Sequence, residues 1–313
     1  MQRNFKGIFV QADAPEFLEK DVQPALEIVD LNALNVADML EARRLRQANF
    51  DTAPFDPDGH ELRFFPGGFT VWSGFPGTGK TTLLRQLVCH LLRAGKSVFV
   101  ASLEEDPQDV FCRLASVALG TENLTADNLQ WCVDCWHDKL RLWSYRRGIA
   151  DHGRILAIIR VLAREGVRHA IIDSLARLDV HSTDWEGQRL FGNALEATAA
   201  KSGAHVHLVA HPRKLVSAAQ EPDINDIAGS ADIGRLADNV LFVRRPDADA
   251  PNAGEFSPMR VNVRKQRYHT GACSTIDGWF NKRLHQWKPH LSDVEVTRYL
   301  PGGAYGELKW GAP

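Results

Sequence analysis

The chain has 313 residues, with 37 Lys+Arg against 39 Asp+Glu and therefore a formal net charge of -2, and hydrophobic residues make up 44% of it. This composition is typical of soluble globular proteins and excludes a disordered or collagen-like chain. No run of about 18 apolar residues occurs, so we expect no membrane span and no membrane partner. Residues 1–17 lack a long apolar run and the chain holds five cysteines, an odd number. Both observations favour a reducing, cytoplasmic compartment without a secretory signal.

The pattern of residues 1–60 differs from that of the rest of the chain. Residues 31–50 place Leu34, Leu40 and Leu45 near one side of a helix. The next stretch, DTAPFDPDGHELRFFPGG, is rich in Pro, Asp and Gly, which is typical of a linker or of an extended lead-in to a domain. We predict an N-terminal extension over residues 1–60, whose helix packs either on its own core or on a neighbouring subunit, and a main domain over residues 61–313.

From Gly68 onward, short apolar strands alternate with helices. We expect strands over residues 69–74, 97–105, 140–145, 169–172, 204–209 and 239–243, helices over residues 81–93, 107–119, 154–164 and 185–201, and strand-like sequence after Pro251. Helices of this length between strands are typical of parallel βαβ units. The sequence therefore predicts an α/β fold with a mostly parallel sheet and antiparallel C-terminal strands.

A phosphate-binding motif lies between the first of these strands and the first helix. Residues 74–81 read GFPGTGKT and match G-x-x-x-x-G-K-[ST] in full. Glycines let the backbone turn its N–H groups toward phosphate oxygens, and the following helix adds its positive N-terminal end. Lys80 is expected to reach the β- and γ-phosphates of ATP, and Thr81 to ligate Mg²⁺. The motif predicts nucleotide binding by Gly74, Phe75, Pro76, Gly77, Thr78, Gly79, Lys80, Thr81 and Thr82.

Two acidic positions end later strands, at the edge where parallel sheets bind ligands. Asp173 ends the strand HAIID and would hold the Mg²⁺, the alternative being an ordinary turn aspartate. Glu104 is the first residue beyond the apolar run VFVASL and would orient or deprotonate the attacking water. The alternative is that Glu104 and its acidic neighbours only cap the helix that begins at Pro107.

Three histidines fall on the strand that precedes the basic sequence PRK. We interpret His205 and His207 as structural residues that face polar surroundings, and His211, at the tip of the strand, as a candidate sensor of the γ-phosphate. The pair Cys132 and Cys135 has the C-x-x-C spacing of zinc ligands but lacks a second pair. Its tryptophan neighbours are expected to cover a hydrophobic surface.

Five sequence blocks occur together in one order: GFPGTGKTT, ASLEED, IIDSL, LVAHPRK, and GSADIGRLADNVLFVRR followed by VRKQRYHTG. Together they resemble the RecA-like motor domain of DnaB-type hexameric replicative helicases, over roughly residues 64–287. The likeness is greatest to phage primase-helicases and the mitochondrial helicase Twinkle. The resemblance implies a RecA-like P-loop NTPase core, ATP and Mg²⁺ as cofactors, and the cytoplasm of a bacterial or phage-infected cell as location.

The resemblance also implies residue roles. Glu104 matches the catalytic glutamate of the family, and His211 the polar residue that senses the γ-phosphate. Lys265 and Arg267 match a basic pair that completes the ATP site of the next subunit, with Arg267 as the arginine finger. Arg245 matches a residue near the adenine. DNA contacts are expected from two loops over residues 179–185 and 212–229, and the DNA-binding residues predicted at and beside the second loop are Arg213, Lys214, Gly229 and Ser230.

The expected function is an ATP-dependent helicase that moves on single-stranded DNA, 5′ to 3′, as a homo-oligomer of six or seven subunits and opens a forked duplex in DNA replication. The chain departs from primase-helicases because no cysteine precedes Cys89, so no zinc or primase region is expected before the P-loop. A separate primase or polymerase would then be its partner, and the helix at residues 31–50 would dock on the adjacent subunit. The alternatives are a RecA-like DNA-binding ATPase of recombination or repair without unwinding activity, and a nucleotide-gated oligomeric scaffold.

Overall fold

A computed structural model describes residues 35–143, 149–180, 184–212, 222–227, 231–246, 254–268 and 273–300. The chain divides into two units, Met1–Asn49 and Phe50–Pro313. In the described part of the first unit, helix α3 (Val36–Ala48) begins at Asn35, whose side chain accepts hydrogen bonds from the backbone N–H groups of Ala37 and Asp38. Val36, Met39, Leu40 and Leu45 are exposed on this helix.

The second unit alternates strands and helices along most of its length. Its strands are β1 (Phe69–Ser73), β2 (Ser97–Ser102), β3 (Leu140–Leu142), β4 (Val167–Asp173), β5 (His205–Val209), β6 (Asn239–Arg244), β7 (Phe256–Gln266), β8 (Ser274–Asn281) and β9 (Gln286–Lys288). Its helices are α4 (Lys80–Arg93), α5 (Pro107–Leu119), α6 (Ala126–Trp136), α7 (His152–Arg164), α8 (Trp185–Ser202) and α9 (Ala231–Leu236), with 3-10 turns η4 (Leu175–Arg177) and η5 (Ile224–Asp226).

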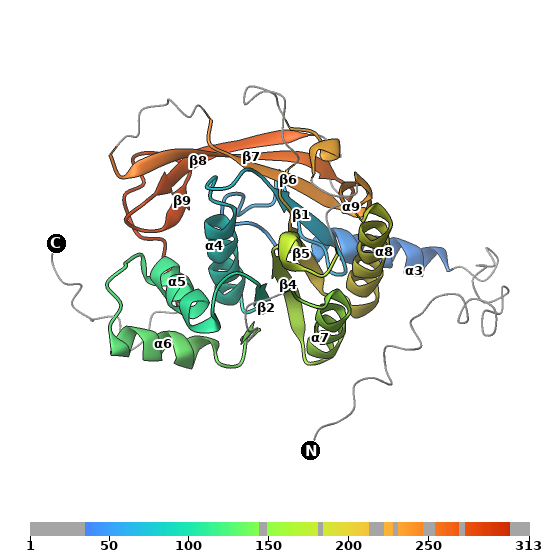
Figure 1. Ribbon diagram of the computed structural model, residues 1–313, viewed down its shortest axis with the longest axis horizontal. Helices are drawn as coiled ribbons and strands as arrows, with labels where there is room; N and C mark the ends of the chain where they lie inside the picture. Colours follow the sequence, from blue (N-terminus) through green and yellow to red (C-terminus); the bar gives the residue numbers. More distant parts are fainter. Residues whose placement is uncertain are drawn as a thin grey trace, which may run out of the picture. The chain divides into compact units, whose positions relative to one another are not determined.

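The strands form one nine-stranded sheet in the order β3-β2-β4-β5-β1-β6-β7-β8-β9 (Figure 1). All pairs from β3 to β6 are parallel, and β7, β8 and β9 continue the sheet as antiparallel strands. The predicted α/β fold with a mostly parallel sheet and antiparallel C-terminal strands is therefore confirmed.

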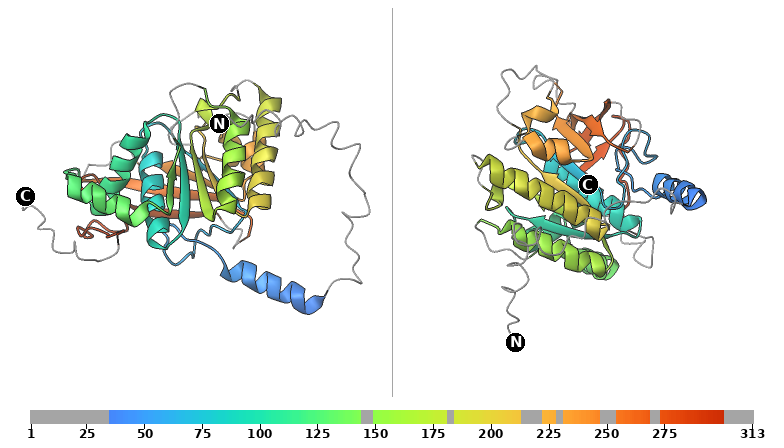
Figure 2. Two further views of the ribbon diagram at one scale, coloured as in Figure 1. Left: turned by 90° about the horizontal axis from the view of Figure 1, so that it is seen from below. Right: turned by 90° about the vertical axis from the view of Figure 1, so that its right-hand side faces the viewer.

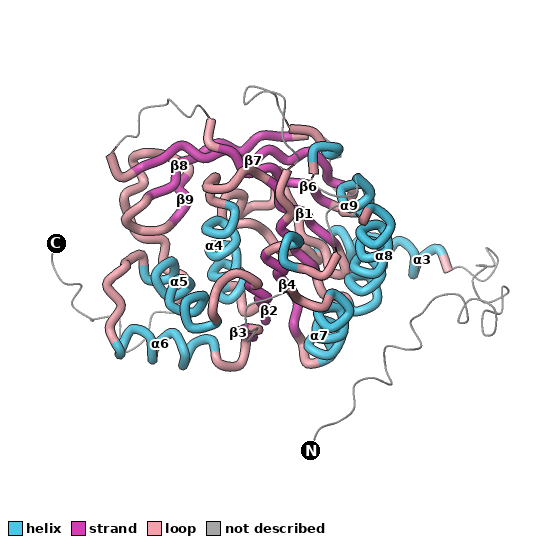
Figure 3. The backbone as a smooth tube through the Cα atoms, in the orientation of Figure 1, coloured by secondary structure: helices cyan, strands magenta, loops and turns pink. Residues whose placement is uncertain are grey.

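Helices cover both faces of the parallel part of the sheet (Figures 2 and 3). Buried residues of α4, α5 and α6 form one hydrophobic cluster with Trp72, Val100 and Ile171. Buried residues of α7, α8 and α9 form the second cluster, with Val71 and Phe99 on the opposite face. Both faces of the parallel strands are buried, which explains why these strands are apolar runs instead of alternating patterns. No helix in the described ranges combines the length and apolarity needed to cross a bilayer.

The segment over residues 51–65, which we call the lead-in segment, belongs to the second unit. Its Ala53, Phe55, Leu62 and Phe64 are buried in the same cluster as α4. The compact second unit therefore begins at Phe50, because apolar side chains in a Pro- and Gly-rich stretch still pack into the core. Pattern alone also failed to predict α6 and α9. Trp136 of α6 is buried and Trp131 packs against the core, which confirms their expected role.

A chain of buried hydrogen bonds crosses three neighbouring strands on the α4 face. The indole Nε1–H of Trp72 on β1 donates to Nδ1 of His207 on β5, at 3.2 Å. His207 and His169 of β4 are joined through Nε2 and Nδ1 at 3.0 Å, and Nε2 of His169 lies 3.0 Å from a carboxylate oxygen of Asp51. An indole N–H can only donate, so Nδ1 of His207 accepts from it and His207 carries its proton on Nε2. This Nε2–H donates to Nδ1 of His169, so His169 also carries its proton on Nε2 and donates it to Asp51.

The third buried histidine is satisfied separately. Nδ1 of His205 lies 2.7 Å from the carbonyl oxygen of Phe65, so this nitrogen carries the proton. Its Nε2 lies 2.7 Å from the hydroxyl of Thr70, which also accepts a hydrogen bond from the amide of Asn239. The structural role predicted for His205 and His207 fits these contacts, but their surroundings combine polar groups with the rings of Phe64 and Trp72.

Burial keeps these histidines neutral. It lowers the pKa of His205 to about 3 and also lowers those of His169 and His207. Burial alone would raise the pKa of Asp51, but the hydrogen bonds and charges of His169 and Lys96 lower it to about 2. The chain of hydrogen bonds therefore has one ionised end, at Asp51, whose second carboxylate oxygen pairs with Lys96 at 2.7 Å.

We expect the free energy of unfolding to fall as the pH drops from 7.5 to 5.5. An unfolded histidine binds a proton below about pH 6.5, whereas the folded protein keeps these rings neutral, so acid favours unfolding by up to about 1.4 kcal/mol per histidine at pH 5.5. Asp51 does not contribute in this range, because its stabilisation is lost only below an unfolded pKa of about 3.9. Urea unfolding at both pH values measures the change. A His205→Gln variant should show a smaller pH dependence, and equal stabilities of the parent protein at both pH values would contradict the assignment.

Candidate active site

Five neighbouring strands end at one edge of the sheet and carry the predicted site residues. In sheet order these are β2 with Glu104, β4 with Asp173, β5 with His211, β1 with the P-loop and β6 with Arg245. The strands are parallel, so their carboxyl ends meet, and ligands of open α/β sheets bind at this edge. The structure therefore brings together Glu104, Asp173, His211 and the P-loop, as the sequence predicts.

The P-loop follows β1 directly and leads into α4. Gly74, Gly77 and Gly79 have φ angles of 146°, 76° and 97°, a region that side chains with a Cβ rarely adopt. Gly74 also lies so close to strand β6 that an added Cβ would overlap the carbonyl oxygen of Val243. The loop thus forms a backbone turn at the N-terminus of a 14-residue helix, where N–H groups and the helix dipole favour anions.

Lys80 is buried at the start of α4. Its ammonium donates to the carbonyl oxygens of Gly74 and Phe75, at 2.6 and 2.9 Å, so it spans the P-loop from inside. Burial lowers the pKa of Lys80, and the charges of Asp173 and Glu104 oppose this shift. The amine therefore lies among the site carboxylates, where it can exchange carbonyl partners for phosphate oxygens.

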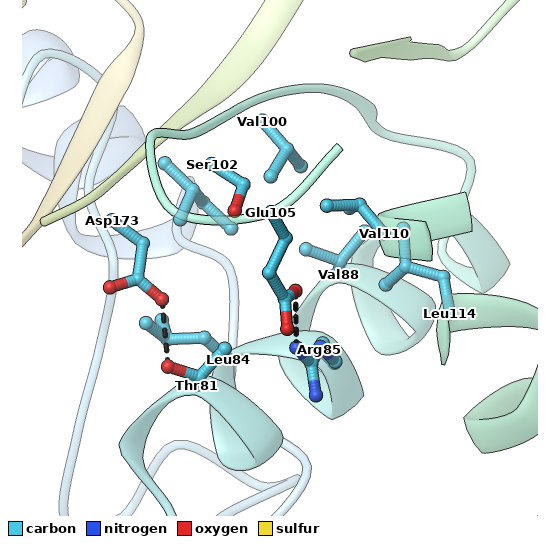
Figure 4. A pocket seen from close by; sticks show the side chains of 11 residues that line it. Thr81, Leu84, Arg85, Val88, Val100, Ser102, Glu105, Val110, Leu114 and Asp173 are labelled. Atoms are coloured by element: carbon cyan, nitrogen blue, oxygen red, sulfur yellow. Dashed lines mark hydrogen bonds and ion pairs between the residues drawn. The ribbon is translucent and has the colours of Figure 1, made fainter. Parts of the chain in front are cut away.

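Thr81 and Asp173 meet between α4 and β4. The Thr81 hydroxyl donates to a carboxylate oxygen of Asp173 at 2.8 Å (Figure 4). Burial raises the pKa of Asp173, and the hydrogen bond from Thr81 opposes the shift. One hydroxyl and one carboxylate at hydrogen-bond distance fit Mg²⁺, which takes few protein ligands and completes its shell with phosphate oxygens and water. In the described residues, no group of three or more His, Cys, Asp or Glu side chains forms a metal cage.

Two adjacent carboxylates at the end of β2 have different surroundings. Glu105 accepts from Arg85 of α4 at 2.6 Å and pairs with Arg113 of α5 at 3.4 Å, beside a small pocket between these helices (Figure 4). Glu104 instead lies among the site residues, and its charge acts on Lys80, Asp173 and His211. Glu105 is thus paired with two arginines, and Glu104 is the carboxylate of the two whose charge acts on both Lys80 and His211.

His211 lies at the tip of β5, between the strand of Asp173 and the strand of the P-loop. Burial lowers its pKa, the charge of Lys80 lowers it further, and Glu104 opposes the shift. Its Nδ1 is buried and has no hydrogen-bond partner among the described residues. A buried ring nitrogen without a partner is rare and costly, which fits a group that bonds to a ligand.

The other predicted residues lie elsewhere. Arg245 is exposed just beyond β6, on the P-loop side of the sheet.

Lys265 and Arg267 lie at the opposite edge of the sheet. Gln266, between them, pairs with Asn239 at the beginning of β6, whereas the P-loop lies beyond the end of β1, a parallel neighbour of β6. Arg267 pairs there with Asp238 at 3.2 Å and Glu196 at 3.5 Å. The predicted DNA-binding residues Arg213, Lys214, Gly229 and Ser230 lie outside the described residues.

Two contacts of Glu104 were not predicted. Its Oε1 accepts a hydrogen bond from the Ser174 hydroxyl at 3.3 Å and forms an ion pair with Nε of Arg177 at 3.6 Å. Both partners follow β4, a different strand from the one that carries Glu104. Only the pairing of β2 with β4, which places Ser102 opposite Asp173, brings them together. A sequence pattern along one segment carries no signal for such a contact.

The fold and the site define a P-loop nucleotide-binding domain. The family model described as AAA domain (AAA_25) matches residues 38–216, which is more than half of the chain. The chain therefore belongs to this AAA domain family.

Comparison with individual proteins confirms the resemblance to the DnaB-type motor domain. A solved structure of an ATPase domain matches with a TM-score of 0.65 and 17% identity, over 80% of this chain and 96% of that one. A solved DnaB-like replicative helicase, described with its interactions with primase, matches with a TM-score of 0.63 and 16% identity, over 82% of this chain and 67% of that one. At these identities the likeness is one of fold.

A curated relative is the Twinkle homolog protein, chloroplastic/mitochondrial, of Arabidopsis thaliana. It is 25% identical over 233 residues, which are 64% of this chain and 31% of the relative. The chain thus spans less than a third of the length of that protein.

The glycines of the P-loop should differ in their tolerance of a side chain. Gly77→Ala adds a Cβ in open space and costs about 1–2 kcal/mol of folding free energy through the positive φ alone. Gly74→Ala should cost more, because the Cβ overlaps the backbone of β6 and the strand or the loop must move. Urea unfolding of both variants measures the difference, and equal stabilities would contradict the close packing of the loop on β6.

Proposed function

We propose that the chain is the ATP-driven motor of a DNA helicase, which hydrolyses Mg-ATP and moves 5′ to 3′ on single-stranded DNA during replication. The proposal assigns residues 1–60 to an extension with a docking helix, of which residues 51–60 pack into the core of the second unit, and residues 61–313 to the motor domain. The observation that carries it is the convergence of Glu104, Asp173, His211 and the P-loop on adjacent strand ends. This convergence supports a site in which groups for phosphate, metal and water would act together at one edge, and the likeness to a solved DnaB-like replicative helicase supports the DNA substrate.

Each residue would act on a different part of the nucleotide. The P-loop backbone of residues 74–79 would surround the phosphates, and Lys80 would exchange its loop carbonyl partners for β- and γ-phosphate oxygens. Thr81 and Asp173 would hold Mg²⁺, which neutralises charge on the phosphates. Glu104 would orient the attacking water and accept its proton, and His211 would contact the γ-phosphate through its unpartnered nitrogen.

The position of the basic pair supports completion of the site by a second subunit. Lys265 and Arg267 lie at the sheet edge opposite to the P-loop, a full strand length from the nucleotide site of their own subunit. A cation that acts on the γ-phosphate from this position would reach the site of a neighbouring copy. A ring of six or seven subunits provides such a neighbour at every site and links hydrolysis to subunit position.

The remaining contacts extend the proposal beyond the nucleotide. DNA would be bound by the loops over residues 179–185 and 212–229, with Arg213, Lys214, Gly229 and Ser230 as the expected contacts, and Arg245 would lie near the adenine. The exposed apolar side chains of α3, Val36 and Leu40 among them, fit a helix that docks on an adjacent subunit. A separate primase or polymerase would act with the ring in the cytoplasm.

Hydrolysis and unwinding are tested together. We expect single-stranded oligo(dT) to raise the ATP turnover, and a forked duplex with a 5′ tail to be opened. Lys80→Ala should lower turnover by at least about 100-fold, since it removes the charge that binds the β- and γ-phosphates. Lys201→Ala, at the exposed end of α8, is the control and should keep both activities.

Three results separate the alternatives. Turnover without stimulation by DNA would contradict the motor, and stimulation without unwinding of either fork polarity would favour the RecA-like ATPase of recombination or repair. Nucleotide-dependent assembly without turnover would favour the scaffold.

The shared site is tested by mixing two inactive variants. Arg267→Ala should lower turnover by about 10³-fold or more, as for other arginine fingers. Mixing it with Lys80→Ala should restore part of the activity, because a wild-type P-loop of one variant then meets a wild-type finger of the other. Unfolding curves of both variants control for loss of structure. An inactive mixture, or an Arg267→Ala variant with full turnover, would show that this arginine is not supplied by the neighbour.

A further inference from the structure

One carboxylate oxygen of Glu104 is engaged within its own subunit. Oε1 accepts a hydrogen bond from the Ser174 hydroxyl and faces Nε of Arg177 in an ion pair of 3.6 Å. A carboxylate that orients water for attack on the γ-phosphate must present its oxygens to that water. Ser174 and Arg177 therefore hold the carboxylate in an arrangement that competes with this role.

The ion pair is open to solvent and easily exchanged. The side chain of Glu104 is 48% exposed and that of Arg177 is 55% exposed. Exposed pairs of this kind contribute little stability and are screened by salt. A phosphate group of a nucleic acid would compete effectively for the guanidinium, which binds phosphate oxygens through paired N–H groups.

The backbone of Arg177 is fixed although its side chain is exposed. Its N–H donates to the carbonyl of Ser174 at 3.1 Å, and its carbonyl accepts from the N–H of Ala150 at 2.9 Å. Two residues later, Asp179 accepts from the backbone and the ring of His152 at the start of α7. The segment is therefore anchored on both sides, and the guanidinium can change partner without movement of the strand that carries Asp173.

Among the described residues, Glu104 is the carboxylate that pairs with Arg177, and the neighbouring carboxylates have other partners. Glu105 is occupied by Arg85 and Arg113. Asp173 accepts from Thr81. Arg177 also lies two residues before the loop over residues 179–185, the first of the two loops for which the sequence predicts DNA contacts. It is thus a cation that contacts the expected catalytic carboxylate and is close in the chain to the expected DNA loop.

We propose that Arg177 is a positioning residue that couples DNA to hydrolysis: without DNA it holds Glu104 together with Ser174, and a phosphate of bound single-stranded DNA draws its guanidinium away and releases Glu104 toward the water. The inference rests on the proposed function, because it assigns to the same site the way in which DNA raises its turnover. It predicts that removal of the guanidinium raises the DNA-free ATP turnover, as bound DNA does.

The test compares ATP turnover with and without saturating oligo(dT) in three variants. Arg177→Gln should raise the DNA-free kcat about two- to fivefold, the range that an exposed ion pair supports. The DNA-saturated kcat should stay unchanged, so that the stimulation ratio falls by the same factor. Arg177→Lys keeps a cation for Glu104 and should retain most of the ratio. The matched control is Arg283→Gln, which removes a similarly exposed arginine paired with Glu255 at 3.3 Å in the turn after β8; it should leave both rates unchanged.

The outcomes are distinct. A DNA-free kcat that falls or stays the same in Arg177→Gln overturns the inference, since a cation that assists catalysis or only supports the fold would behave so. An equal loss of both rates in Arg177→Gln and Arg177→Lys, with lowered unfolding stability, also overturns it. If the parent protein itself shows turnover without any response to DNA, the proposed motor function fails. The DNA-free rates of parent and Arg177→Gln then still decide whether Arg177 restrains Glu104.

Discussion

The register of the parallel strands is the constraint on which the site depends. At the edge that carries the P-loop, Ser102 of β2 lies opposite Asp173 of β4, Ile172 of β4 opposite Leu208 of β5, and Val209 of β5 opposite Trp72 of β1. Glu104, Ser174, His211 and Gly74 follow these pairs within two residues. A shift of any one strand by one residue would turn its side chains to the other face and separate the phosphate, metal and water groups.

The buried histidines help to fix this register. Apolar strands that are covered on both faces could pair in more than one alignment with little loss of hydrophobic contact. The bonds from Trp72 through His207 and His169 to Asp51 join β1, β5 and β4 in one alignment, since a buried polar group without its partner costs about 1–3 kcal/mol. The same bonds tie the lead-in segment to the strands beneath the site. Their sensitivity to acid follows from the requirement that the rings stay neutral.

The sequence predicts the parts of the molecule that are encoded locally. The P-loop, the apolar runs and the polar residue at the end of each run lie within single segments, and so the parallel sheet and the residues at its edge could be inferred. Short helices such as α9, with six residues, carry too little periodicity for detection. The contacts of Glu104 with Arg177, and of Trp72 with His207, join separate strands through their register. No pattern along the chain encodes them.

The two arginines assigned to the catalytic cycle share one property. Arg177 pairs with Glu104 at the P-loop edge, and Arg267 pairs with Asp238 and Glu196 at the opposite edge, where its guanidinium also donates to the carbonyl oxygens of Arg235 and Leu236. Each therefore has partners inside its own subunit that it must exchange in order to act on DNA or on a neighbouring nucleotide. The Arg177–Glu104 pair is exposed, so its exchange costs little, whereas Arg267 must leave the buried carboxylate of Asp238, which costs more. Under the proposal, an isolated subunit holds a site in which neither cation is yet in its working position. In a ring bound to DNA, a DNA phosphate would compete for Arg177 at the P-loop edge. The phosphates of the neighbouring subunit's nucleotide would compete for Arg267 at the opposite edge.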